Sequence, residues 1–173
     1  RLQGPPRHHP PGRHGAPVTG DVIRPATPAD LDALVALESG FPEEDRFDRR
    51  TWRRLLGGQT ATLVHESGGR IDASAVLLFR QGSDIARLYS IAVAVDARGQ
   101  GLGARLLSAC EDQARLRRSR ALRLEVRATN SSAHRLYESA GYRVIAALES
   151  YYPDGEAAHR MEKVLIAPSD GVP

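Results

Sequence analysis

The chain has 173 residues, of which 41% are hydrophobic and 26% charged, and its formal net charge is +3. This composition is typical of a globular domain that can bury a substantial core. No apolar stretch approaches the ~18–20 residues of a membrane-spanning helix, and no signal-peptide apolar segment is seen. The single cysteine, Cys110, excludes an internal disulfide and a cysteine-based zinc site, and it fits a reducing, cytoplasmic environment.

Residues 1–20 differ in composition from the rest of the chain. They contain five prolines, four glycines and three arginines but no acidic residue. Such a segment buries too little apolar surface to offset the entropy of ordering it, so we expect a disordered basic tail there and a disordered end at 168–173. Without the tail, 21 Lys and Arg (24 minus 3) face 21 Asp and Glu, so no basic face for nucleic acid is indicated.

Residues 21–167 are expected to form one domain of mixed α/β type, since strand-like and helix-like segments follow one another without repeats. Thr27 suits a helix N-cap and Pro28 a first helical position, whereas Gly57-Gly58 is expected to end a second helix. In chain order we expect a strand at 21–25, a helix from 28 with Leu31, Leu34, Val35 and Leu37 on its apolar face, a helix at 48–56, strands at 60–66, 71–80 and 84–95, a helix at 102–118, a strand at 121–127, a helix at 131–140, and strands at 142–152 and 157–166.

The most informative segment is Arg98-Gly-Gln-Gly-Leu-Gly-Ala104, which lies between the β-prone run 88–95 and the amphipathic helix 102–118. A glycine-rich turn into a helix N-terminus presents several unpaired backbone N–H groups to one point, and the helix dipole adds partial positive charge there. Because glycine has no Cβ, the backbone can approach phosphate oxygens closely. The segment predicts a phosphate or pyrophosphate site, with a purely geometric strand-to-helix turn as the alternative.

Other kinds of ligand site are not indicated by the sequence. No Gly-Lys-Ser/Thr follows the glycines, which excludes a Walker-type loop, and Ala104 follows Gly103, which breaks the dinucleotide-binding spacing. His65, His134 and His159 are scattered without paired ligand spacing, so no metal is expected.

The order of elements, with the glycine loop after the fourth strand, resembles the GNAT superfamily of acetyl-CoA-dependent N-acetyltransferases over about residues 21–166. The family signature Arg/Gln-x-x-Gly-x-Gly/Ala stands here at Arg98–Gly103. Segments 124–130, 136–138, 141–142 and 150–161 are similar to the ribosomal-protein alanine N-acetyltransferases (the RimI type). The resemblance implies an α+β fold with a mixed, mostly antiparallel sheet of six or seven strands flanked by about four helices.

The same resemblance implies where the cofactor binds. In the family, the backbone of the glycine loop holds the pyrophosphate of CoA, the splayed end of the fourth strand binds the pantetheine arm, and an asparagine also contacts CoA. Asn130 matches that asparagine, although helix capping is an equally good use for it. The implied cofactor-binding residues are Ile91, Ala92, Val93, Arg98, Gly99, Gln100, Gly101, Leu102, Gly103, Ala104 and Asn130.

An amine attacks a thioester only when it is neutral, and the thiolate leaves more readily with a proton, so the reaction needs a base and an acid. Glu125 and Tyr137 match the family's base and acid. Their alternative roles are a surface carboxylate that pairs with Arg123 or Arg127, and a half-buried core tyrosine. Tyr151 and Tyr152 are the candidates for acceptor recognition, and cross-strand packing is their alternative role.

The expected function is acetyl transfer from acetyl-CoA to a primary amine, with a protein or peptide N-terminal α-amine as the first choice. An α-amine has a pKa of ~7.7–8 and a lysine one of ~10.4, so a lysine site must recover about 3.4 kcal/mol more to deprotonate its substrate. A small amine (polyamine, amino acid or aminoglycoside) is the alternative, because Glu43, Glu44 and Asp45 suit a polycation. A further alternative is that the protein binds CoA without catalysing a reaction. We expect no nucleic-acid or membrane partner, and a monomer or homodimer.

Overall fold

The computed structural model describes residues 20–165, so the expected disordered segments 1–20 and 168–173 lie, apart from Gly20, outside the described residues. Within this range one seven-stranded sheet runs in the order β1-β2-β3-β4-β5-β7-β6. All neighbouring strands are antiparallel except β4 and β5, which are parallel. The elements are β1 (Val22–Pro25), α1 (Leu31–Glu38), α2 (Arg49–Leu55), β2 (Thr60–Ser67), β3 (Arg70–Phe79), β4 (Ile85–Val93), α3 (Leu102–Leu116), β5 (Ala121–Arg127), α4 (Ser131–Ser139), β6 (Arg143–Leu148) and β7 (Ala158–Val164), with short 3-10 helices at Pro28–Asp30, Glu43–Asp45 and Val95–Ala97.

The predicted α+β architecture and order of elements are confirmed. Three strands are markedly shorter than predicted, one of them β7, which spans Ala158–Val164 instead of 157–166. β4 ends at Val93 because the chain turns into the 3-10 helix Val95–Ala97. β6 ends at Leu148, since Ser150 adopts a φ of 49°, a left-handed conformation that a strand does not contain.

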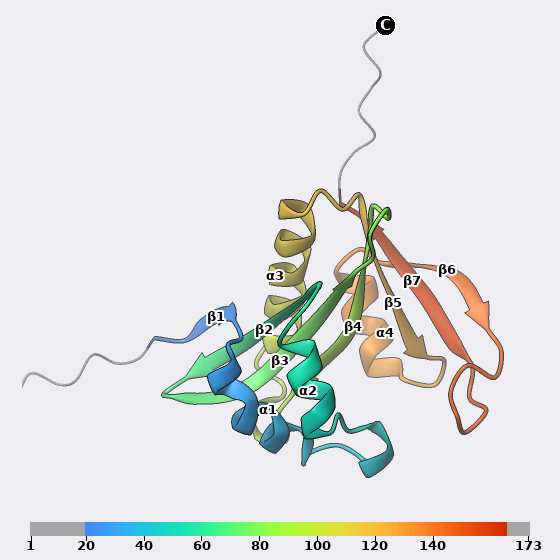
Figure 1. Cartoon of the computed structure of the whole chain (residues 1–173). Coiled ribbons are helices and arrows are strands. Elements are labelled where there is room, and N and C mark those ends of the chain that lie inside the picture. The colour runs from blue at the N-terminus through green and yellow to red at the C-terminus, as the bar shows by residue number, and fades with distance from the viewer. Residues whose placement is uncertain (1–19, 166–173) are drawn as a thin grey trace, which may run out of the picture.

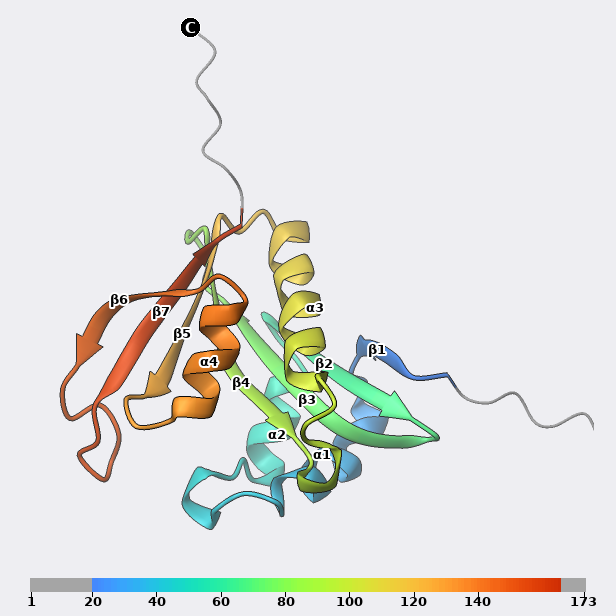
Figure 2. The same ribbon diagram turned by 180° about the vertical axis from the view of Figure 1, so that it is seen from behind.

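Two helices lie on each face of the sheet. Figure 1 shows α1 and α2 in front of the strands, and Figure 2 shows α3 and α4 on the opposite face. Along β5 the side chains alternate, so that Leu122, Leu124 and Val126 pack into the core with α3 and α4. The polar residues between them therefore point to the face that carries α1 and α2. None of the described helices is long and apolar enough to cross a membrane.

Strands β4 and β5 diverge along their length (Figure 2). They pair only from Ile85 to Arg87 of β4, opposite residues 121–123 of β5. Just beyond, Tyr89 is an extra residue opposite the Val76–Leu77 step of β3, which makes a β-bulge. A bulge bends its strand and increases its twist, so the end of β4 turns away from β5. In the described part of the chain, the edge of β4 beyond Arg87 has no strand partner on that side.

A buried histidine ties the start of β1 to the sheet. The side chain of His65 on β2 is only 3% exposed, and its two ring nitrogens face the carboxylates of Asp21 and Asp72. Asp21 also accepts from Arg105 of α3 at 3.0 Å. Burial alone lowers the pKa of His65, but the hydrogen bonds to Asp72 and Asp21 outweigh it, so the pKa is raised. The two carboxylates therefore favour the protonated, cationic form of His65.

This pairing predicts a pH-dependent stability. A group whose folded pKa exceeds its unfolded value stabilises fully below the unfolded pKa, about 6.5 for histidine, and the contribution is lost as the pH rises through the folded pKa. The variant His65→Gln should lose about 1.5–3 kcal/mol of unfolding free energy at acidic pH, and the loss should shrink towards pH 9. Denaturant unfolding between pH 6 and 9 measures it. Arg70→Gln, which breaks the exposed pair of Arg70 with Asp96, is the control and should show a constant difference. A loss for His65→Gln that does not change with pH contradicts the assignment.

Candidate active site

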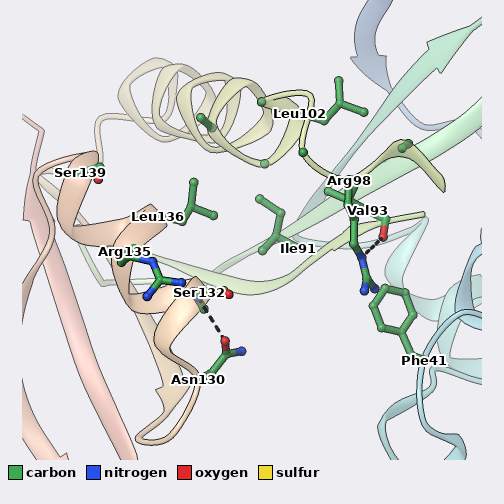
Figure 3. Close-up of a pocket in the computed structure, with 16 residues that line it drawn as sticks. Phe41, Ile91, Val93, Arg98, Leu102, Asn130, Ser132, Arg135, Leu136 and Ser139 are labelled. Carbon is green, nitrogen blue, oxygen red and sulfur yellow. Dashed lines mark hydrogen bonds between the residues drawn. The ribbon is translucent and has the colours of Figure 1, made fainter. Parts of the chain in front are cut away.

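A cavity of about 790 Å³ opens where β4 leaves β5. Its floor is the end of β4, and its walls are the N-terminus of α3 and one face of α4 (Figure 3). Ile91 and Val93 point into it from β4, because the bulge places them on the same face as Leu88. The cavity therefore lies between the two helices that cover this face of the sheet.

The glycine loop lines one end of this cavity with backbone rather than side chains. Gly99 and Gly101 have φ values of 77° and 78°, which side-chain-bearing residues rarely adopt, and a Cβ on either would meet no atom within 4 Å. Gly101 is the N-cap of α3, so the N–H groups of the first helical turn have no partner within the helix. Open space, unpaired N–H groups and the helix dipole together suit an anionic group.

At Gly103, the need for a small residue comes from packing between helices rather than from backbone conformation. It lies in the first turn of α3, and a Cβ there would approach Leu136 Cδ2 of α4 to 3.4 Å. A small residue at this position lets α4 pack directly against the start of α3. The third glycine of the loop thus sets the distance between the two walls of the cavity.

Most of the predicted cofactor-binding residues line this cavity, namely Ile91, Val93, Arg98, Gly99, Gly101, Leu102, Gly103, Ala104 and Asn130. Two do not. Ala92 is buried in the core because its side chain alternates with those of its neighbours along β4, and Gln100 is exposed outside the cavity. The remaining lining residues, which the sequence analysis missed, are Phe41, Ala97, Ser132, Ala133, Arg135, Leu136 and Ser139. Those on α4 recur at helical spacing after Asn130, which is the signal that identifies them.

Asn130 caps a helix, the role that the sequence analysis gave as the alternative to contact with CoA. Its side chain accepts a hydrogen bond from the N–H of Ala133 at 3.1 Å, which caps α4 (Figure 3). It also lines the cavity, so capping leaves its amide group available to a ligand.

Two arginines reach this cavity from opposite walls. Arg98 donates to the carbonyl of Val93 at 3.2 Å and lies 5.6 Å from the centre of the Phe41 ring. Arg135 extends from α4 on the other side (Figure 3). An elongated ligand with phosphate groups at one end fits this arrangement, because it meets main-chain N–H groups, two cations and the unpaired edge of β4. The residues present therefore fit CoA.

Glu125, the predicted base, lies in a second cavity of about 720 Å³ on the opposite face of the sheet. Its side chain is only 7% exposed. Arg87 Nε donates to one carboxylate oxygen at 2.9 Å, and Arg160 Nε donates to the other at 3.1 Å. The salt-bridging role, given as the alternative, is therefore realised, although its partners are Arg87 and Arg160 rather than Arg123 or Arg127.

Tyr137, the predicted acid, is almost fully buried at 6% exposure. Its ring packs edge-on against Tyr142, with 5.9 Å between centroids. Burial raises the pKa of Tyr137 to about 12, so the phenol stays protonated at neutral pH. It does not line the cofactor cavity, whereas its neighbours Ala133 and Leu136 do. Glu125 and Tyr137 thus lie on opposite faces of the sheet.

The hairpin between β6 and β7 lies beside Glu125. Tyr151 Oη accepts from Arg87 Nη2 at 2.9 Å, so this tyrosine contacts the same arginine that holds Glu125. The ring of Tyr152 lies 4.1 Å from the Arg127 guanidinium and 5.0 Å from the Tyr151 ring. Both predicted acceptor-side tyrosines therefore border the face on which Glu125 lies, and packing accounts for part of their contacts.

Other reactive groups have no place in this site. Cys110 is fully buried in the core, and burial raises the pKa of its thiol to about 12, which is not the state of a nucleophile. Across residues 20–165 no three His, Cys, Asp or Glu side chains are grouped to hold a metal ion.

Comparison with known proteins identifies related sequences. The model of the Acetyltransferase (GNAT) family matches residues 29–142. An uncharacterised protein of Mycobacterium leprae is 36% identical over 163 residues, which cover 85% of this chain and 43% of that protein. The [ribosomal protein bS18]-alanine N-acetyltransferase of Escherichia coli K12 is 44% identical over 84 residues, which cover 49% of this chain and 55% of the enzyme. These aligned parts span about half the length of the curated relatives.

Solved structures show the same fold. The crystal structure of the ribosomal-protein-S18-alanine N-acetyltransferase from Escherichia coli superposes with a TM-score of 0.77 at 31% identity. The superposition covers 88% of this chain and 99% of that one. The sheet, the helices and their connections are therefore shared over nearly the whole described range.

The glycines at 101 and 103 have different roles, so two different substitutions test the proposed binding site. Gly101→Glu places a negative charge in the open space at the start of α3, and Gly103→Val drives a branched side chain into Leu136. Each should weaken CoA binding by about tenfold or more, which is about 1.4 kcal/mol. Isothermal titration with CoA measures the affinities. Gly57→Ala, a glycine change away from the cavity, should bind CoA as the wild type does. Wild-type affinity in both loop variants would refute this binding site.

Proposed function

Because the chain belongs to the GNAT family of acetyltransferases, we propose that it transfers the acetyl group of acetyl-CoA to the N-terminal α-amine of a protein or peptide. The observation that carries this proposal is the divergence of β4 and β5 beyond Arg87, with the glycine loop at one side of the opening. It leaves a strand edge and a helix N-terminus available to one elongated ligand. We also propose a cytoplasmic location, which the single buried thiol fits.

Acetyl-CoA supplies an activated thioester, and the chain supplies the means to hold it. The N–H groups of the first turn of α3, preceded by Gly99 and Gly101, bind the pyrophosphate. The unpaired backbone groups of Ile91 and Val93 bind the amides of the pantetheine arm. Asn130 adds an amide from the start of α4.

The roles of base and acid follow from the family resemblance of Glu125 and Tyr137, which lie on the two faces of the sheet. Glu125 takes a proton from the acceptor ammonium on the α1–α2 face, directly or through water. Tyr137, protonated at neutral pH, donates its proton to the departing thiolate from the α3–α4 face. Each oxygen of Glu125 accepts one arginine N–H, and because a carboxylate oxygen has two lone pairs, each can still accept a proton from an amine or a water.

An α-amine suits this site better than a polycation. The cavity around Glu125 is lined by four arginines and one carboxylate, which repel a polyamine or an aminoglycoside. Glu43, Glu44 and Asp45, which favoured such an acceptor in the sequence, lie in a short exposed 3-10 helix outside that cavity, and Asp45 pairs with Arg127. The name of the related enzyme, a [ribosomal protein bS18]-alanine N-acetyltransferase, also supports a protein N-terminus.

The catalytic assignment predicts separate effects on binding and turnover. The double variant Glu125→Gln, Tyr137→Phe should retain CoA affinity and lose transfer by about 10²-fold or more, because general acid–base catalysis is removed. Calorimetric CoA titration and a thiol-release assay measure the two properties. The control is Glu66→Gln, which changes another arginine-paired carboxylate, on β2 and outside both cavities. Equal rates in the double variant and in this control would remove Glu125 and Tyr137 from these roles, and a CoA-binding module without turnover predicts no release in either of them.

Acceptor choice gives a further prediction. A peptide with a free α-amine and no lysine should release CoA thiol, whereas the same peptide with a blocked N-terminus and one lysine should react at least about 10²-fold more slowly, given the difference of about 2.5 in amine pKa. The rate with the α-amine should rise with pH up to about 8, as the amine deprotonates. A panel that includes spermidine, free amino acids and an aminoglycoside completes the test. A faster reaction with any of these small amines would replace the peptide by that class of acceptor.

A further inference from the structure

The second cavity lies where the acceptor must lie if the proposed function is correct, and the following inference rests on that function. Glu125 is part of its lining, and the cavity extends from β5 and β7 across β4 to the end of β3. On this face α1 and α2 stand in front of the β2–β4 part of the sheet, and no described helix covers β5 and β7 (Figure 1). An acceptor whose amine reaches Glu125 therefore has its following residues in or beside this cavity.

The charge of the cavity is unbalanced. Four arginines line it, one each from the end of β3, from β4, from β5 and from β7, and Glu125 is the only carboxylate in its lining. The β5 arginine, Arg123, is additionally paired with Glu162 of β7. Even with that pairing, four positive charges face two negative ones. The rest of the domain gives no reason for such an excess, since residues 21–173 carry equal numbers of cationic and anionic side chains.

The arginines are held in a way that leaves their outer nitrogens available. Arg123 donates to Glu162, and Arg87 and Arg160 donate to Glu125, in every case through Nε. In the described part of the chain, the terminal nitrogens of these three side chains have one protein acceptor between them, Tyr151 Oη on Arg87. Arg80, on the exposed turn after β3, has no ion-pair partner in residues 20–165. Terminal guanidinium nitrogens held in place by an Nε contact are well suited to a carboxylate, which they bind in a bidentate manner.

We propose that this arginine-lined cavity binds carboxylate side chains of the acceptor, so that the enzyme selects α-amines that are followed by acidic residues. Three extended residues after the first span about 10 Å, so positions two to four of such a peptide lie in the cavity while its amine is at Glu125. A carboxylate bound by the terminal nitrogens of Arg87 or Arg160 leaves their Nε contacts with Glu125 in place. Acceptor recognition and proton removal therefore use different atoms of the same arginine–carboxylate cluster.

Peptides that differ only in charge test this proposal. Ala-Asp-Glu-Asp and Ala-Asn-Gln-Asn, each followed by the same neutral tail, have nearly the same shape. The acidic peptide should show a kcat/KM about fivefold higher at low salt, mainly through a lower KM, since an exposed charge pair contributes up to about that factor. The preference should diminish towards about 0.5 M NaCl, where exposed charges are screened.

Two variants distinguish an effect of the arginines in this cavity from an effect of the overall charge of the protein. Arg80→Gln should reduce the acidic-to-amide ratio by at least about twofold, because it removes one unpaired cation from the cavity. Arg53→Gln removes the same charge from an exposed position on α2 outside the cavity and should leave the ratio unchanged. Thermal melting checks that both variants are folded. Equal ratios in the two variants would overturn the assignment to this cavity.

A binding measurement distinguishes failure of this inference from failure of the proposed function. N-acetylated Ala-Asp-Glu-Asp cannot react, and calorimetry at low salt should detect its binding to the wild type and a weaker affinity in Arg80→Gln. Binding of this peptide without transfer to any free peptide would support the acidic ligand and refute peptide acetylation. Transfer without an acidic preference would support the proposed function and overturn the inference. Equally tight binding of inorganic phosphate, or of a short single-stranded DNA, would show a general anion site and overturn the peptide assignment.

Discussion

The divergence of β4 from β5 is the constraint on which both cavities depend. The two strands share only three residue pairs, and the bulge at Tyr89 follows directly after them. Had the parallel pairing continued, the backbone groups of β4 would bind β5, and the sheet would separate its two faces completely. Because the pairing stops, one ligand can bind the strand edge from the α3–α4 face while a second molecule approaches from the opposite face. The fold thereby leaves room for two molecules to meet at this gap, at the cost of a few sheet hydrogen bonds.

The second constraint is the alternation of apolar and charged side chains along β5. Its apolar residues anchor it against α3 and α4, so its charged residues must point to the open face, where they pair across strands with β7. Arg123 with Glu162 and Glu125 with Arg160 are directly opposite pairs. Glu125 is thus held by the same regular pattern that stabilises the sheet. A strand that is ordinary in its structure places a carboxylate at the gap beside β4.

Much of this architecture was predictable because it depends on local sequence. The glycine loop, the caps at Asn130 and Thr27 and the alternation of apolar and charged residues in β5 each follow from a few consecutive residues. The contacts of Glu125 were not predictable in the same way. Arg87 meets it only because β4 and β5 pair in parallel over three residues, and that register is set by the whole sheet. Phe41 reaches the cofactor cavity from an irregular loop after α1, where no periodicity indicates the direction of a side chain. The bulge at Tyr89 likewise changed which residues of β4 face the cavity, and it left Ala92 in the core.

The packing of α4 connects the cofactor site to the proposed acid. Leu136 lies against the start of α3 because Gly103 has no side chain, and Tyr137 is the next residue of the helix. Beyond the end of α4, Tyr142 donates to the buried carboxylate of Glu111 on α3, and Lys163 of β7 binds the same carboxylate. Leu136, in the second half of α4, and Tyr142, just after its end, thus both contact α3, which also carries the N–H groups of the glycine loop. A change in the packing of α4 on α3 therefore shifts the phenol of Tyr137 relative to the loop. For this reason Gly103 affects the position of the proposed acid through packing, whereas Gly101 affects the proposed cofactor site through the space that it leaves open.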